Sequence, residues 1–352
     1  MQKQDFPYIL VINPGSTSTK LGYFYGTKAK ESISVNHLKD PEWPKLTPEE
    51  RFRRRLTAAR EFIRGKKIDM IMARGGLLKP LPSGIYIINE AMLRDLKNAP
   101  RRHASNLAAP IAKIIADELG VPAYVADPVT TDELNDIARY SGHPAFPRIS
   151  IFHALNHKAT ARKFAASQGK KYEDLHLIVV HMGGGISVGA HKKGKVTDVN
   201  QALDGDGPFS PERSGSLPAG DLVRAAFSGQ YARDELLKMI TGEGGLKAYT
   251  GTADVKSLLQ RGNPDDLKAV DAMLYQTAQQ TAAMAVALDG KIDAILLTGG
   301  LARSDYVINR LKQHLHFLGA PIHVFPGENE MEALAYNGML VWEGKQKPIP
   351  YS

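Results

Sequence analysis

A strand, a small polar loop and a second strand near the start of the chain constrain its fold most. Residues 9–12 are an apolar, mostly β-branched run that predicts a buried strand, and residues 21–24 predict its partner. Between them, Gly15 lets the backbone approach a ligand, and hydroxyls and one ammonium supply donors and charge. The donors singled out in this loop are Ser16, Ser18 and Lys20. The pattern favours a phosphate-holding hairpin, with an ordinary Ser/Thr-rich turn as the alternative.

The same arrangement recurs in the middle of the chain. Residues 175–181 predict a strand, Gly183, Gly184 and Gly185 form a turn, and residues 186–190 predict the next strand. A strand follows each loop where a helix would be needed, so the patterns of P-loops and of dinucleotide-binding loops are both excluded. Two such units predict duplicated domains with a nucleotide in a cleft between them.

A third glycine turn follows the apolar run at residues 294–297. Thr298, Gly299 and Gly300 lead toward a predicted helix at Ser304–Leu318, which would leave free backbone amides at the turn. Its place after a long helical pattern at Ala269–Leu288 favours nucleotide binding over a routine strand-to-helix turn.

Helical and strand patterns alternate through the rest of the first half. Helices are predicted at Pro48–Arg64 and Ser105–Leu119, the second interrupted early by Pro110, and strands at 68–73 and 121–126. This alternation is typical of an α/β domain with ligand groups at strand ends. Gly and Pro between Ser141 and Pro147 mark a boundary. We therefore expect domains at residues 1–145 and 146–330, with a C-terminal helix at about 331–352 as a candidate to pack back on the first.

Composition limits the class of protein. The 352 residues suffice for two domains, and the absence of cysteine excludes disulfides, thiolate metal sites and thiol nucleophiles. No signal peptide or membrane span is predicted, so a cytoplasmic location is expected. The net charge of +8 comes from scattered basic residues, which argues against nucleic acid as a partner. The basic cluster Arg51–Arg55 is expected on a solvated helix face.

Four motifs in order along the chain carry a resemblance. They are Asn13–Lys20, His181–Gly185, Pro211–Gly215 and Leu297–Gly300. Together they resemble the acetate and butyrate kinase family, within the superfamily of sugar kinases, actin and heat-shock chaperone ATPases. The resemblance implies two ribonuclease H-like, actin-like ATPase domains, with ATP in the cleft. Phosphoryl transfer from ATP, with Mg²⁺, to a short-chain carboxylate such as butanoate would give an acyl phosphate and ADP. A homodimer or larger homo-oligomer is also implied.

The resemblance assigns roles to individual residues. Asn13 and Lys20 fall on the first phosphate loop, and the second phosphate loop and the nucleotide-binding turn correspond to His181, Gly183, Gly184, Gly185 and Thr298 to Arg303. The residues implied in catalysis are Arg74 for the carboxylate, Asp127, His153 and Arg213. For Mg²⁺ the resemblance implies Asn13 and a glutamate. An ungapped match puts asparagine at the glutamate position, so Glu330 is preferred and Glu328 is the alternative.

The residue types suit this chemistry. A carboxylate that attacks a phosphate is an anion approaching an anion, and arginines such as Arg74 and Arg213 bind both groups bidentately. Histidines at 153 and 181 would donate to phosphoryl oxygens. Because the acceptor acid is already ionised at neutral pH, Asp127 is read as an orienting group in preference to a base. A helix face for His153 and His157, and a helix cap for Asp127, remain the structural alternatives.

Other functions on the same scaffold stay open. Branched-chain acids, propionate and acetate are alternative acceptors, because the pocket volume that selects chain length leaves no mark in the sequence. A sugar kinase would use Asp127 as its base, and an actin-like nucleotide switch would have no catalysis. The paired arginines suit an anionic acceptor better than a neutral hydroxyl.

Overall fold

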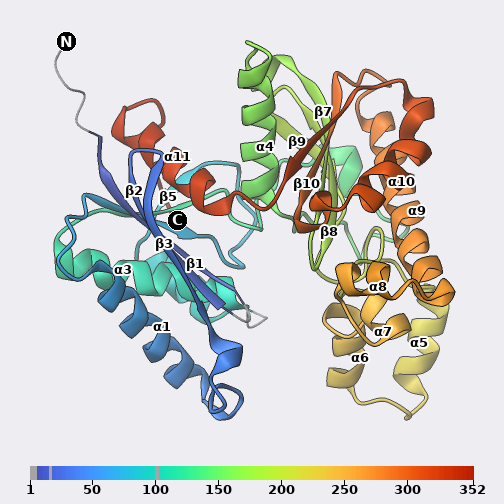
Figure 1. Cartoon of the computed structure of the whole chain (residues 1–352), viewed down its shortest axis with the longest axis horizontal. Helices are drawn as coiled ribbons and strands as arrows, with labels where there is room; N and C mark the ends of the chain where they lie inside the picture. Colours follow the sequence, from blue (N-terminus) through green and yellow to red (C-terminus); the bar gives the residue numbers. More distant parts are fainter. Residues whose placement is uncertain (1–5, 16–17, 100–102) are drawn as a thin grey trace. The chain divides into compact units, whose positions relative to one another are not determined.

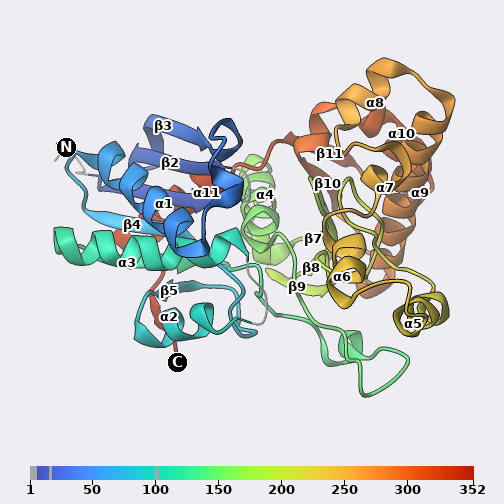
Figure 2. The ribbon, with the colours of Figure 1, turned by 90° about the horizontal axis from the view of Figure 1, so that it is seen from below.

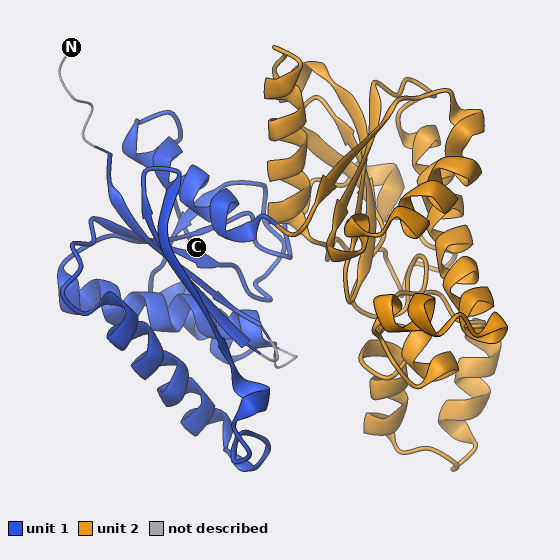
Figure 3. Ribbon diagram, viewed as in Figure 1, with its two compact units in different colours: residues 1–131, 329–352 blue, residues 132–328 orange. Residues whose placement is uncertain are grey.

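The computed structural model describes residues 6–15, 18–99 and 103–352, and these form two compact units (Figure 3). Unit 1 comprises residues 1–131 and 329–352, and unit 2 comprises residues 132–328. The expected first boundary lies further along the chain, at residue 145, in a segment that here belongs to unit 2. Among the described residues, no helix has the length and apolar character needed to cross a membrane.

Unit 1 is built on a mixed sheet. Within the described residues the strand order is β12-β5-β6-β4-β1-β2-β3, with β1, β2 and β3 antiparallel and β4 and β6 parallel to β1. The strand bounds are β1 (Tyr8–Pro14), β2 (Ser18–Tyr25), β3 (Lys28–Asn36), β4 (Met70–Arg74), β5 (Ile85–Ile87), β6 (Ala123–Ala126) and β12 (Ile349–Pro350).

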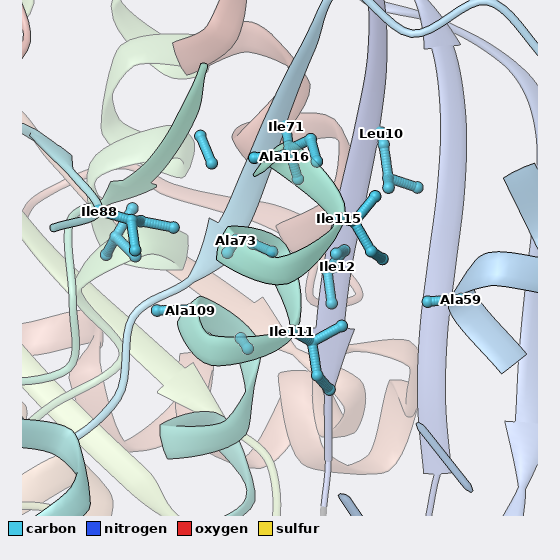
Figure 4. Close-up of a cluster of buried hydrophobic side chains, with 14 of the residues drawn as sticks. Leu10, Ile12, Ala59, Ile71, Ala73, Ile88, Ala109, Ile111, Ile115 and Ala116 are labelled. Atoms are coloured by element: carbon cyan, nitrogen blue, oxygen red, sulfur yellow. The ribbon is translucent and has the colours of Figure 1, made fainter. Parts of the chain in front are cut away.

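Helices cover both faces of this sheet (Figure 1). They are α1 (Pro48–Ile63), α2 (Glu90–Lys97), α3 (Ala108–Leu119) and α11 (Glu330–Trp342). Leu10 and Ile12 of β1 point to the α1 and α3 side and pack with Ile111 and Ile115 (Figure 4). Alternate residues of β1 face α11, because side chains change face at each step along a strand. A Cβ at Gly338 of α11 would lie 3.0 Å from the Ile9 side chain, so the helix packs tightly on that face.

Unit 2 repeats the sheet of unit 1. Its strand order is β11-β10-β7-β8-β9, with β7, β8 and β9 antiparallel and β10 and β11 parallel to β7. This is the order of β6-β4-β1-β2-β3 in unit 1, so the duplication predicted from the two glycine loops is present in the topology. The strand bounds are β7 (His176–Met182), β8 (Ile186–Lys192), β9 (Lys195–Val199), β10 (Ala294–Gly299) and β11 (Ile322–Pro326).

Helices also cover both faces of the second sheet (Figures 1 and 2). Leu177 and Val179 of β7 pack with α4, while Ile178 and Val180 pack with α9 and α10. The helix bounds in unit 2 are α4 (Ala154–Ser167), α5 (Ala219–Phe227), α6 (Arg233–Thr241), α7 (Leu246–Thr250), α8 (Val255–Arg261), α9 (Pro264–Ala287) and α10 (Asp305–Leu315).

The predicted elements are largely confirmed, with three differences. The segment before α3 is a 3₁₀ helix at Ala104–Leu107, and Pro110 lies in the first turn of α3, where a missing N–H costs no hydrogen bond. A 3₁₀ turn at Gly300–Arg303 separates β10 from α10. The basic cluster is only partly solvated: Arg53 and Arg54 are exposed, but Arg55 is 3% exposed, so the expected solvated face is wrong for that residue.

Candidate active site

The parallel strands of unit 1 bring three predicted residues to one edge of its sheet. Ile12 pairs with Ala73, and Arg74 pairs with Ala126, so the carboxyl ends of β1, β4 and β6 lie together. Asn13 is the next-to-last residue of β1, Arg74 ends β4 and Asp127 directly follows β6. The sheet order therefore gathers side chains that are far apart in the sequence.

Asn13, Arg74 and Glu330 form one hydrogen-bonded cluster. The Asn13 Nδ2 donates to Glu330 Oε2 at 2.7 Å, and Arg74 Nη1 lies 3.3 Å from Asn13 Oδ1 and 3.2 Å from Glu330 Oε2. Asn13 is 3% exposed and Glu330 is 6% exposed. Glu328, the alternative, has an exposed position two residues earlier. The cluster thus joins the amide and carboxylate expected to hold Mg²⁺ with the arginine expected to bind the acceptor carboxylate.

Asp127 lies directly after β6 in a strained backbone conformation. Its φ is +38°, a value that residues other than glycine rarely adopt, and its side chain is 3% exposed. The Oδ1 accepts hydrogen bonds from Ser83 Oγ at 2.6 Å and from the Gly84 amide at 3.1 Å. Such strain persists only where neighbouring groups fix the conformation. The contacts hold this carboxylate in one orientation.

Lys20 lies directly opposite Asn13 in the β1–β2 pair. Directly paired residues project from the same face of an antiparallel sheet, so both side chains leave the sheet on the α11 side. Ser18 is half-buried at the start of β2, and Ser16 lies outside the described residues.

Arg55 supports the first loop from the opposite face. Its guanidinium donates to the carbonyls of Gly15 at 2.9 Å and Ser18 at 3.0 Å, and to the Thr19 hydroxyl at 2.6 Å. Thr19 also contacts His37 Nε2 at 2.8 Å. Burial lowers the pKa of Arg55 to about 10, with a smaller effect of nearby Arg51. Burial, and then the charge of Arg55, lowers the pKa of His37 to about 4.

In unit 2, two predicted histidines stack on each other. The ring centroids of His153 and His181 are 3.8 Å apart and nearly parallel. His153 Nδ1 contacts Ser187 Oγ at 2.8 Å, while His181 Nδ1 contacts Asn156 Oδ1 at 2.8 Å. His153 immediately precedes α4 and His181 lies in β7, so the helix and the strand fix one ring each.

The triple-glycine turn lies against Arg213. A side chain at Gly185 would overlap with the Arg213 guanidinium, whose Nη1 donates to the Ala202 carbonyl. A Cβ at Gly183 would lie 3.2 Å from His181 Nε2. Glycine at these positions lets a histidine and an arginine side chain lie close to the backbone.

In the third turn, at residues 298–300, two of the three residues pack against neighbouring backbone. Thr298 is fully buried, and its hydroxyl donates to the Gly327 carbonyl at 3.2 Å. Gly299 has a φ of +91°, and a Cβ there would overlap with the Met182 backbone. Arg303 lies close to Gly327. Gly300 has open space where a side chain would project, so the turn presents backbone at that position.

Four residues with contacts to the site were not singled out from the sequence: Ser83, Asn156, Ser187 and Arg55. Asn156 follows His153 by three residues, a helical spacing that places both on one face of α4 and could have indicated it. Ser187 is the second residue of the strand after the glycine turn, and nothing in its sequence context sets it apart. Ser83 becomes relevant only through the folded position of Asp127.

Comparison with known proteins agrees with this architecture. Residues 148–339 match the acetokinase family. A probable butyrate kinase of Bacteroides thetaiotaomicron is 48% identical over 96% of this chain and 98% of its own. Butyrate kinase 2 of Clostridium acetobutylicum is 48% identical over 97% of this chain and 99% of its own.

A solved structure confirms the predicted fold class. The acetate kinase of Porphyromonas gingivalis superimposes with a TM-score of 0.74 at 17% identity, covering 96% of this chain and all of that one. At this identity the likeness concerns the fold, that of the actin-like ATPases with ribonuclease H-like units. The family match, the 48% identity over nearly the whole length of two relatives, and the duplicated sheets with their glycine loops together show that the chain belongs to the acetokinase family.

Proposed function

We propose that this protein is a butyrate kinase, which transfers the γ-phosphoryl group of ATP to butanoate in a reversible reaction. The products are butanoyl phosphate and ADP. The observation that carries the proposal is the 48% identity, over nearly the whole chain, to two relatives named as butyrate kinases. The fold is shared by an acetate kinase at only 17% identity, so an identity of 48% supports the activity beyond the fold.

The unit 1 cluster supports binding of the acceptor and of a metal ion. Arg74 would bind the butanoate carboxylate, since a guanidinium forms two parallel hydrogen bonds with it. Glu330 and Asn13 offer the oxygen donors that Mg²⁺ prefers, and one or two protein ligands with nucleotide phosphates are typical of its sites. When bound, Mg²⁺ would neutralise charge on the phosphates during transfer. In that state, Glu330 would exchange contacts with Asn13 and Arg74 for the metal.

The unit 2 residues support binding of the nucleotide and of the transferring group. ATP would be held mainly through backbone amides of His181, Gly183, Gly184 and Gly185, and of Thr298 to Arg303. The Thr298 side chain is buried and bonded to Gly327, so this residue would contribute its backbone alone. Arg213 and His153 would stabilise the charge that is spread over the phosphoryl oxygens.

Asp127 would orient its neighbours without removing a proton. The acceptor acid is ionised at neutral pH, so the reaction needs no base. The contacts from Ser83 and Gly84 fix the carboxylate, which suits an orienting role. A sugar kinase, the alternative from another class, would need this carboxylate as a base.

We also propose a cytoplasmic, homo-oligomeric enzyme that acts without nucleic acid or membrane partners. Access to the cellular pool of ATP supports this location. Helices α5 and α6, both wholly within the described residues, bury none of their side chains and expose Val223, Phe227 and Met239, which supports self-association.

A hydroxamate assay tests the activity. Hydroxylamine traps butanoyl phosphate as it forms from butanoate, ATP and Mg²⁺, and kcat/KM over straight and branched acids of two to six carbons identifies the acceptor. We expect the highest kcat/KM with butanoate and a loss of at least about 100-fold in Arg74→Ala and in Arg213→Ala, since each removes a charge-assisted contact in the transition state.

A surface arginine provides the control for the assay. Arg53 has a side chain that is 73% exposed and pairs only loosely with Glu49, so Arg53→Ala should retain full activity. Phosphorylation of a sugar panel in place of acids would overturn the proposed function. Full activity in both Arg74→Ala and Arg213→Ala would overturn the proposed site.

A further inference from the structure

A chain of hydrogen bonds leads from His153 into the interior of unit 2. His153 Nδ1 lies 2.8 Å from Ser187 Oγ, which lies 2.9 Å from His157 Nε2. His157 Nδ1 lies 3.2 Å from His191 Nε2, and His191 Nδ1 lies 2.6 Å from the Tyr172 hydroxyl. The candidate site is thus connected through three polar side chains to a buried phenol.

The fold places these groups in a row. Ser187, Gly189 and His191 alternate along β8 and therefore share one face, while His157 lies one helical turn after His153 on α4. A Cβ at Gly189 would lie 3.2 Å from His157 Nδ1. Glycine at this position leaves space for the His157 ring between Ser187 and His191.

The two inner histidines are neutral. His157, His191 and Ser187 are all 0% exposed. Burial is the main cause that holds the pKa of His157 and of His191 well below the usual range, and the positive charge of Lys158 lowers both further. A neutral imidazole has one N–H donor and one acceptor nitrogen. The rings of His157 and His191 therefore each donate on one side and accept on the other.

The direction of every hydrogen bond in the row depends on the one made by Tyr172, at its buried end. A phenol is a good hydrogen-bond donor, and the Tyr172 hydroxyl has an imidazole nitrogen at 2.6 Å. If Tyr172 donates to His191 Nδ1, His191 must donate from Nε2, His157 must donate from Nε2, and the serine hydroxyl must donate outward. The last acceptor is His153 Nδ1.

We propose that Tyr172, His191, His157 and Ser187 are positioning residues that hold His153 in the neutral tautomer with its proton on Nε2. This inference rests on the proposed function, in which that Nε2–H donates to an oxygen of the transferring phosphoryl group. A donor that is already oriented needs no rearrangement during the reaction. Buried hydrogen-bonded networks of this kind fix the tautomer of a functional histidine.

The stacked partner His181 is held in the opposite tautomer. Its Nδ1 faces Asn156 Oδ1, and Asn156 Nδ2 donates to the Glu328 carbonyl, which fixes the orientation of the amide. His181 therefore carries a proton on Nδ1 and gains one on Nε2 only when it becomes cationic. The two stacked rings are thus held by different partners, His153 by Ser187 and His181 by Asn156.

Tyr172→Phe tests the chain, because it removes one hydroxyl and keeps the ring. Nitrogen-15 NMR of the histidine side chains, with His153→Gln to assign the signals, reports the tautomer directly. We expect the Nε2–H form of His153 in the wild type and a mixture with the Nδ1–H form in Tyr172→Phe. The kcat for butanoyl phosphate formation should fall about 2- to 10-fold, the effect of one hydrogen bond, with the KM for ATP unchanged.

Two further variants complete the test. Ser187→Ala breaks the chain beside His153 and should release its tautomer more fully than Tyr172→Phe. Tyr351→Phe, which removes a buried hydroxyl 2.6 Å from Asp95 in unit 1, should leave the His153 signals and kcat unchanged. An Nδ1–H tautomer of His153 in the wild type, or one that neither variant alters, would overturn the proposal. Because the tautomer is read without turnover, an inactive wild type would count against the proposed function alone.

Discussion

Asn13 shows how one side chain links the ends of unit 1. Its amide donates to Glu330 and accepts from Arg74, so it holds a carboxylate and a guanidinium that come from the two separate chain segments of unit 1. In Asn13→Ala, Glu330 would retain Arg74 alone, and both groups would lose their orientation toward metal and substrate. We expect kcat to fall about 10- to 100-fold with a smaller change in the KM for ATP, as for residues that orient metal ligands. Initial rates with varied ATP measure both constants.

Asn98 gives the control for this prediction. It is exposed at the end of α2, so Asn98→Ala should not alter either constant. An equal loss of kcat and of ATP affinity in Asn13→Ala would show that the loop serves only to bind the nucleotide.

His37 gives a pH dependence at the scale of one residue. Its pKa is lowered to about 4 in the folded protein, mainly by burial, while the unfolded chain binds the proton near pH 6.5. Between these values the unfolded state binds more protons, so acidification favours unfolding and stability falls from about pH 6.5 to about pH 4. We expect His37→Gln, which can still contact Thr19, to reduce this slope in calorimetry. A slope equal to that of the wild type would exclude His37 as the cause of this pH dependence and would point to the buried His157 and His191.

Helix α1 anchors the first loop at the scale of the element. Arg55 satisfies two loop carbonyls and a hydroxyl, and lies 5.1 Å above the Trp43 ring. In Arg55→Met these acceptors lose a charged donor, and we expect urea unfolding to show a loss of about 2–4 kcal/mol. Arg53→Met on the same helix removes an exposed side chain and should change stability by less than about 0.5 kcal/mol. Equal stabilities for both variants would contradict an anchoring role.

The elements were predictable from sequence where local chemistry decides them. Apolar runs and glycine turns gave both sheets, and their recurrence gave the duplication, since strand period and turn preference are local properties. The prediction of a solvated position for Arg55 was wrong because an arginine in a basic run has no local mark of burial. The Trp43 ring and the loop carbonyls that surround its guanidinium come from other elements.

The residues of the candidate site were predictable from the sequence, but the contacts among them were not. Glycines and strand-end side chains were found from pattern and resemblance. The contacts among Asn13, Arg74 and Glu330 depend on packing of α11 against β1, a pairing across more than three hundred residues. The chain behind His153 likewise depends on α4 and β8 facing each other, which no local period specifies.

At the scale of the whole molecule, the exposed helices of unit 2 bear on self-association. Val223 is 57% exposed and Phe227 is 88% exposed, one helical turn apart on α5. If this face joins two copies, a charge there would be desolvated without a partner, so Phe227→Glu should shift sedimentation toward the monomer. Tyr140→Glu alters another side chain of unit 2, 81% exposed, and should not change the mass. An unaltered oligomer in Phe227→Glu, or a monomeric wild type, would contradict this prediction.

The division of unit 1 into two chain segments has a consequence for biosynthesis. Residues 1–131 leave the ribosome before unit 2 is made, but α11 and Glu330 follow only after residue 328. One face of the first sheet therefore stays uncovered while unit 2, which is continuous in the chain, is synthesised and folds. Any nascent chain that stops before residue 330 lacks both the covering helix and the carboxylate. Synthesis of α11 thus supplies the last residue of the Asn13, Arg74 and Glu330 cluster and covers the open face of the first sheet.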